Sequence, residues 1–153
     1  MKCYFRMKKR GLFIIIVLLI SGSLLFYSGP LDKWRVRGVT KGIEKAIEQE
    51  DSGKIMSRIS LKYTDDYGYN YSMVKQLLTD LFQDFDEFDV TIQNPVIETR
   101  DDTATVKFDV WVTVDWNGNP SYIVGTNRSS AHISVFLAKE FLSWKVVRVE
   151  GVK

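Results

Sequence analysis

Two adjacent aspartates lie among three tyrosines, just after an apolar periodic segment. The stretch SLKYTDDYGYN places Asp65 and Asp66 between Tyr63 and Tyr67, with Tyr69 two residues further on. A carboxylate can act as a general base when burial or a second carboxylate tunes its pKa, and tyrosine hydroxyls can donate to a developing oxyanion. We therefore name Asp65 and Asp66 as candidate catalytic residues, and the three tyrosines as candidate ligand-binding residues.

The same stretch also has the composition of a turn. Asp-Asp before Tyr-Gly is common turn chemistry, because an aspartate side chain can accept hydrogen bonds from the backbone that follows it. Neighbouring residues of an extended segment point to opposite sides, so at most one of Asp65 and Asp66 would face a cavity. Both the turn and the general base stay open at this point. The acid spacing does not match a calcium-binding loop and no second acid cluster is visible, so we expect no metal and no cofactor.

His132 is the single histidine of the chain, which excludes sites that need several. It alternates with Ile133 in a strand-like segment, where it would lie either on a cavity wall or on the outer face of a sheet. We keep His132 as a candidate ligand-binding residue, with a structural or solvent-facing role as the alternative.

Trp111 stands where the pattern of its strand expects a polar residue. It shares the polar face of that segment with Asp109 and Thr113. Tryptophan is enriched in binding hot spots, so we predict an interface at Trp111, Asp109 and Thr113. Cross-strand packing within one sheet face is the alternative.

The first 30 residues have the pattern of a membrane-directed leader. Residues 1–10 carry five basic side chains and no acid, and residues 11–29, GLFIIIVLLISGSLLFYSG, carry no charge. As a helix, nineteen residues would cover about 28 Å, close to the hydrocarbon thickness of a bilayer. We expect a transmembrane anchor with a cytoplasmic N-terminus and an extracytoplasmic remainder, at the cell membrane. Small residues behind residues 12–20 leave a cleaved signal peptide, and so a secreted domain, as the alternative.

The charge and cysteine content limit what the exported part can do. Of 21 basic side chains five lie in the leader, so 16 remain against 19 acidic ones, a balance of −3. This argues against nucleic acid as a partner. Cys3 is the one cysteine and lies in the leader, so the exported part holds together without a disulfide.

The remainder of the chain has helix-like periodicity first and strand-like periodicity after Phe88. We expect a linker at residues 31–37 and a domain at residues 38–153. The expected helices run from Val39 to near Gly53, around Met56, and from an N-cap at Ser72 to Phe85. Four strands are expected, around Val90–Val96 and at Ala104–Trp116, Ser121–Ala138 and Ser143–Val149. The first has a bulge or edge at Pro95, and the third is interrupted near Asn127–Ser129. The expected turns lie at Asp101–Asp102, Asn117–Gly118 and Lys139–Glu140. This is an α+β fold with helices on one face of a curved antiparallel sheet of four or more strands.

This order of elements, with the stretches IEKAIEQEDSGKIMSRIS, YTDDYGYN, DDTATVKFDV and FLSWKVVRVEG, resembles the nuclear transport factor 2-like superfamily, also called SnoaL-like or cystatin-like cones. The resemblance covers residues 38–151. It implies a sheet wrapped around helices to form a conical cavity, and frequently a dimer through the outer sheet face. In ketosteroid isomerase and polyketide cyclase relatives an acid near the cavity moves a proton, and Asp65 and Asp66 occur in a comparable region.

Two functions follow as hypotheses, because this fold hosts enzymes and members without activity. The first is a membrane-tethered extracytoplasmic domain that binds a ligand or a protein without catalysis, as in a scaffold of an envelope assembly. Its partners would be the membrane, through residues 11–29, and a second copy or an envelope protein at the outer sheet face. The second is a small isomerase, dehydratase or hydrolase that uses Asp65 or Asp66 as its base.

Overall fold

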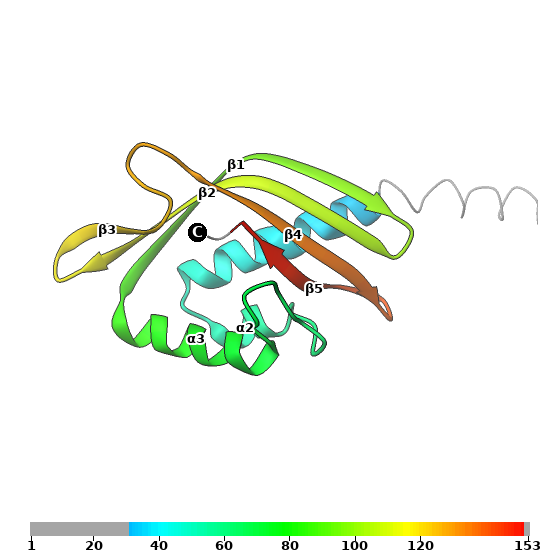
Figure 1. Ribbon diagram of the computed structural model, residues 1–153, viewed down its shortest axis with the longest axis horizontal. Helices are drawn as coiled ribbons and strands as arrows, with labels where there is room; N and C mark the ends of the chain where they lie inside the picture. Colours follow the sequence, from blue (N-terminus) through cyan, green and yellow to red (C-terminus); the bar gives the residue numbers. More distant parts are fainter. Residues whose placement is uncertain (1–30, 152–153) are drawn as a thin grey trace, which may run out of the picture. The chain divides into compact units, whose positions relative to one another are not determined.

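A curved antiparallel sheet packed against helices forms the part of the chain that the computed structural model describes, residues 31–151 (Figure 1). The chain divides into two units, Met1–Asp32 and Lys33–Lys153, and all the strands described lie in the second. The predicted membrane segment, residues 11–29, falls outside the described residues. Within residues 31–151, no helix is both long and apolar enough to cross a membrane.

Residues 31–48 are helical and lie across the inner face of the sheet (Figure 1). We refer to this element as the 31–48 helix. Residues 31–37, expected as a linker, belong to it, because the buried Val36 extends the predicted apolar face of Val39 and Ile43 backward by one turn. The predicted face is otherwise confirmed, since Ala46 is buried and Ile47 packs against the sheet residues.

Two more helices follow, α2 (Ser52–Met56) and α3 (Tyr71–Asp84). The side chain of Asp51 caps α2 by accepting from the backbone N–H of Lys54 at 2.9 Å. Asn70, and not the predicted Ser72, caps α3, because its side-chain oxygen accepts from the N–H of Met73 at 3.1 Å. The long helix was therefore predicted correctly, and its start lies slightly earlier than expected.

The sheet has five strands. They are β1 (Asp86–Arg100), β2 (Thr103–Trp116), β3 (Asn119–Val124), β4 (Ala131–Glu140) and β5 (Ser143–Glu150). The segment expected as one interrupted strand is β3 and β4, joined by residues 125–130. β2 is central: β1 pairs along one side of it, while β4 and β3 pair with successive halves of its other side, and β5 pairs with β4.

Bulges in β1 curve the sheet. The register between β1 and β2 shifts between Gln93 and Val96, where Asn94 has a φ of 51°, so the bulge expected at Pro95 is confirmed. The predicted Asn117–Gly118 hairpin is also confirmed, with both residues at positive φ, 56° and 78°. The β4–β5 turn lies at Phe141–Leu142, slightly later than expected.

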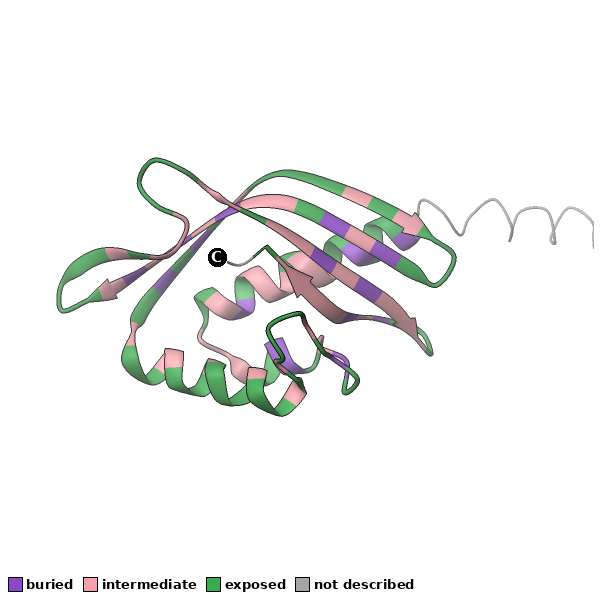
Figure 2. Cartoon of the chain, viewed as in Figure 1, coloured by how far each residue is buried: buried purple, intermediate pink, exposed green. Residues whose placement is uncertain are grey.

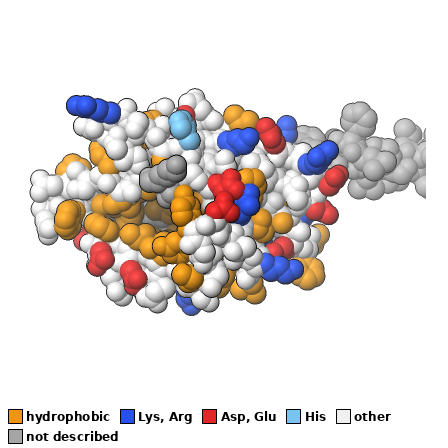
Figure 3. All heavy atoms as spheres, viewed as in Figure 1, with side chains coloured by type: hydrophobic (Ala, Val, Ile, Leu, Met, Phe, Trp, Pro, Cys, Tyr) orange, Lys and Arg blue, Asp and Glu red, His pale blue; other side chains and the backbone are white. Residues whose placement is uncertain are grey.

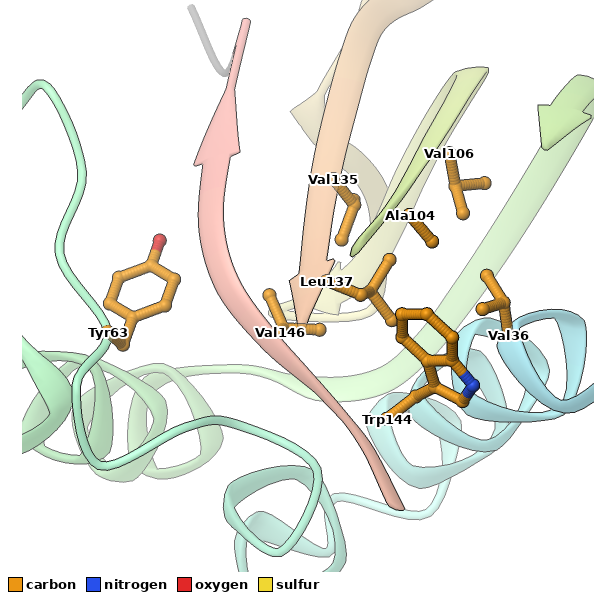
Figure 4. Packing of buried hydrophobic residues seen from close by; sticks show 8 residues of the cluster. All are labelled: Val36, Tyr63, Ala104, Val106, Val135, Leu137, Trp144 and Val146. Carbon is orange, nitrogen blue, oxygen red and sulfur yellow. The ribbon is translucent and has the colours of Figure 1, made fainter. Parts of the chain in front are cut away.

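The concave face of the sheet carries the core, which consists of two clusters of buried side chains (Figure 2). One contains Val36, Tyr63, Ala104, Val106, Val135, Leu137, Trp144 and Val146 (Figure 4), and the other contains Phe88, Val90, Val110, Val112 and Val114. Phe108 and Ile133 pack against both. α3 only covers this core, since none of its residues is buried.

The segment between α2 and α3 runs beside the outer edge of β5. Val146 accepts from the N–H of Ser60 and donates to the carbonyl of Arg58, both at 2.9 Å, and Thr64 donates to Val147 at 3.2 Å. These bonds occupy a strand edge that would otherwise be open. They also place the following residues, Asp65 and Asp66, beside β5.

Candidate active or ligand-binding cavity

An apolar cavity of about 240 Å³ is lined by both the 31–48 helix and the sheet. Ile43 and Ile47 line it from the helix. The strands contribute Val90, Phe108, Val110, Val112, Ile133 and Val149, among others. Figure 3 shows hydrophobic side chains gathered around a hollow on one face of the molecule. Among the residues that the structure describes, Thr40 and Glu44 are the polar members of the lining.

The position of the cavity follows from the two core clusters. Its strand lining draws on both clusters, with Val135 and Val149 from one side and Val90 and Val112 from the other. Valine is short, so side chains from the two walls leave space where protein interiors are normally filled. This space is partly open to solvent, and its apolar walls suit apolar guests.

Glu44 is the one carboxylate at this cavity. It also borders a neighbouring hollow, together with Arg37 and Lys41. Burial raises the pKa of the Glu44 carboxyl, the charge of Glu48 raises it further, and the charge of Lys41 lowers it. A carboxylate whose pKa is raised is a stronger base than an ordinary exposed one.

Sequence reasoning missed Glu44, because it placed this residue on the polar side of its helix. The spacing contains a signal that would have found it. Val36, Thr40 and Glu44 follow one another at intervals of four residues, which places them on one helical face. Since Val36 is fully buried, the two polar residues that follow it on the same face also approach the sheet.

Asp65 organises a turn. Its carboxylate accepts from the backbone N–H groups of Tyr67 at 3.0 Å and Tyr69 at 2.9 Å, and from the Tyr63 hydroxyl at 3.0 Å. Burial, and then the neighbouring Asp65 carboxylate, raise the pKa of the Tyr63 phenol well above its usual range. Asp66 is exposed and lies 3.9 Å from the Arg148 guanidinium.

None of these residues lines the apolar cavity. Tyr63 is buried in the cluster around Leu137, Tyr69 packs against that cluster, and Tyr67 is exposed. The structure thus brings the three tyrosines and Asp65 together in one loop, and it brings Glu44 rather than either aspartate to the cavity.

His132, Asp109 and Trp111 lie on the convex face of the sheet. The His132 ring is exposed, and its Nδ1 pairs with the Asp109 carboxylate. Asp109 also accepts from Asn94 Nδ2 at 2.9 Å, and this bond, followed by the His132 contact, lowers the Asp109 pKa. Trp111 Nε1 donates to the Thr126 carbonyl at 3.1 Å, which holds the half-buried indole against the 125–130 loop.

The predicted interface residues therefore share one face, but part of the Trp111 surface is used within the chain. A groove beside Trp111 and Thr113 is also lined by Tyr122 and Asn127. A dimer or protein partner at this face stays a prediction. Among residues 31–151, no group of three or more histidine, cysteine, aspartate and glutamate side chains is placed to hold a metal ion.

No protein-family model and no curated protein sequence matches the chain. Solved structures with the same fold do match. A proposed scytalone dehydratase from Novosphingobium aromaticivorans has a TM-score of 0.68 at 11% identity, over 78% of this chain and 82% of that one. A nuclear transport factor 2-like protein from Salmonella enterica serovar Typhimurium has a TM-score of 0.64 at 16% identity, over 79% and 91%.

A third similar structure is larger than this chain. Bd1075 of Bdellovibrio bacteriovorus has a TM-score of 0.63 at 15% identity over 76% of this chain, and the match spans 38% of the Bdellovibrio protein. Together these similarities show that the chain has the cone fold of the nuclear transport factor 2-like proteins, as the resemblance implied. At such identities they show the fold alone.

The Asp65 turn predicts unequal effects of two neighbouring substitutions. Asp65→Ala should lower the free energy of unfolding by about 1–3 kcal/mol, because two backbone N–H groups and a buried hydroxyl lose their acceptor. Asp66→Ala should change it by less than about 0.5 kcal/mol, because its side chain is exposed. Urea denaturation of the full chain in detergent, followed by tryptophan fluorescence, measures both. Equal losses would contradict the structural role of Asp65.

Glu44 predicts a pH-dependent contribution to stability. Because folding raises the Glu44 pKa, its contribution is present at acid pH and is lost as the pH rises through the folded-state pKa. Glu44→Gln should therefore stabilise the fold more at neutral pH than at acid pH. In a carboxyl ¹³C titration, Glu44 should titrate above an ordinary glutamate, and Glu48→Gln should move that titration downward. A Glu44 that titrates at or below the ordinary value would overturn this account.

Proposed function

We propose that this protein is a membrane-tethered, extracytoplasmic cone domain that binds a small apolar ligand without catalysing its conversion. The observation that carries the proposal is the cavity, whose lining is apolar apart from Thr40 and Glu44. Ligand pockets have this composition, with a mostly apolar wall and a few polar groups that orient the ligand. The tether is supported by the five basic residues and the uncharged stretch of the leader.

The size of the cavity limits the ligand. An apolar cavity of about 150 Å³ can hold benzene. A cavity of about 240 Å³ therefore suits one substituted ring or a short branched hydrocarbon. Thr40 and Glu44 would favour a ligand that presents a hydroxyl or amine hydrogen to that end of the cavity, because both side chains can accept a hydrogen bond.

A second candidate function is an enzyme, and Glu44 is the observation that favours it. Its carboxyl borders the cavity and has a raised pKa, which are two properties of a general base. One similar structure is a proposed dehydratase. Against this candidate, the residues that line the cavity include no tyrosine, histidine or amide side chain to stabilise a developing oxyanion. We therefore favour binding without catalysis.

Filling the cavity should abolish binding. Ile133→Phe adds volume at a residue that lines the cavity, whereas Ile123→Phe makes the same change in β3 at a residue outside that lining. Titration with indole, followed by methyl NMR of the valine and isoleucine residues, should show saturable shifts in the parent protein. Ile133→Phe should weaken binding about tenfold or more, because the added ring occupies the space of the guest, and Ile123→Phe should leave it nearly unchanged. Equal affinities in the two variants would place the indole elsewhere.

Proton exchange in a bound ketone distinguishes binding from catalysis. Cyclohexanone in heavy water exchanges its α protons through an enol, and a general base in the cavity would accelerate this exchange. We expect the same rate with and without the protein, measured by proton NMR at saturating protein. An acceleration that is lost in Glu44→Gln, with cyclohexanone still bound, would establish the enzyme instead. Loss in Asp65→Asn but not in Glu44→Gln would assign the base to the predicted aspartate.

A further inference from the structure

One end of the domain exposes large apolar side chains from three separate segments. Trp34 in the 31–48 helix, Leu61 in the segment beside β5, and Phe141 and Leu142 in the β4–β5 turn are 74%, 79%, 101% and 88% exposed. Single exposed apolar residues are ordinary, but a group of four at one end marks a contact surface. We refer to these four residues as the apolar end.

Two contacts tie the segments of the apolar end together. Trp34 and Leu142 line the same shallow groove, together with Arg35 and Arg58. The Ser60 hydroxyl, next to Leu61, donates to the Glu140 carboxylate, next to Phe141, at 2.5 Å. The beginning of the 31–48 helix and the β4–β5 turn also lie at the same end of the domain in Figure 1.

The β4–β5 turn is unusual for a turn in water. Phe141 has a φ of 56°, a conformation that glycine and asparagine adopt readily and a bulky aromatic residue adopts rarely. Its side chain is fully exposed, so packing within the domain does not compensate for this conformation. Asp101 of the β1–β2 turn has a similar φ of 49°, so this backbone conformation belongs to the tight turn, and the distinguishing feature of the Phe141–Leu142 tip is the exposure of its two large apolar side chains.

The surroundings of Trp34 are basic. Residues 33–41 contain Lys33, Arg35, Arg37 and Lys41 and no acid, and all four side chains are exposed. Tryptophan flanked by lysine and arginine is the composition of segments that lie at a membrane surface. Asp101 and Asp102 lie at the same end on the β1–β2 turn, where the Asp102 carbonyl accepts from the N–H of Lys139 at 2.8 Å, so the basic group is the one carried by the helix around Trp34.

The sequence also brings a bilayer within reach. Gly29 ends the uncharged stretch, and the five residues from there to Trp34 span at most about 18 Å. We propose that the apolar end docks on the surface of an anionic lipid bilayer, with Trp34, Phe141 and Leu142 inserted among the headgroups and the exposed Arg35 beside lipid phosphates. This rests on the tethered half of the proposed function and not on the ligand in the cavity.

Docking at the bilayer would fix the orientation of the domain. The 31–48 helix enters the domain at the docked end, and the cavity is lined further along the same helix, at Thr40, Ile43 and Ile47. The cavity would then lie about two to four helical turns along the helix from Trp34, because each turn takes about 3.6 residues and advances about 5.4 Å. An apolar ligand that partitions into the bilayer is the kind of guest that such a position serves.

An environment-sensitive label tests the docking on the full chain. With Cys3→Ser removing the single native cysteine, Leu142→Cys is labelled with a nitrobenzoxadiazole dye and the chain is reconstituted into vesicles of phosphatidylcholine and phosphatidylglycerol. Tyr122→Cys, an exposed position in β3, is the matched control. Lipids with a nitroxide on the acyl chain should quench the label at Leu142 about threefold more than at Tyr122. The difference should shrink in phosphatidylcholine alone and at high salt.

The outcomes separate the possible occupants. Equal quenching at the two positions overturns the proposal. The proposal is also overturned if the label at Leu142 is already shielded in detergent and shows energy transfer between two copies of the chain. In that case a second copy covers the apolar end. Flotation after alkaline extraction reports the tether separately. If the chain is extracted, the labelled protein added to anionic vesicles must still float with them and be quenched at Leu142, and failure to do so refutes the docking.

Discussion

The fold depends on the packing of one helix against one strand face. The apolar face of β2 alternates with residues that are polar apart from Trp111, and the bulges of β1 curve the sheet so that this face becomes concave. The 31–48 helix fits the concavity by its two ends, where Val36 and Ala46 are buried almost completely. Between these two positions Thr40 and Glu44 of the helix lie opposite valine side chains of the sheet, and a space remains between the helix and the sheet. The cavity is thus a consequence of how the helix is held.

The packing of the helix on the sheet also decides which acidic residue stabilises the fold and which one borders the cavity. Asp65 lies among residues of the types found in catalytic sites, but it stabilises a loop, because its carboxylate accepts hydrogen bonds from two backbone N–H groups and from the Tyr63 hydroxyl. Glu44, which looks like a surface residue in the sequence, borders an apolar cavity whose lining draws on both core clusters. A carboxyl beside apolar side chains costs stability when it ionises. A Glu44 carboxyl that binds a ligand or a proton would account for this cost, and the position of Glu44 therefore links the cavity to function.

Much of this could be predicted from the sequence, for identifiable reasons. The period of two in β2, the Asn117–Gly118 turn and the spacing of leucines in α3 are local signals, and each gave the correct element. The choice of N-cap was wrong because both Asn70 and Ser72 can cap, and only the course of the preceding loop decides between them. The residues that line the cavity could not be predicted, since they come from a helix and five strands whose register and curvature are set by bulges. The convex placement of His132 follows from its register with Asp109, which the sequence of one strand does not contain.

The central claim is that the cone is hollow and apolar between its two core clusters. A crystal structure of the protein under xenon pressure tests this most directly, because xenon occupies dry apolar cavities and scatters strongly. The account predicts a xenon site in contact with Ile43, Val110 and Ile133. An absence of xenon between the helix and the sheet, with side chains filling that space, would contradict it.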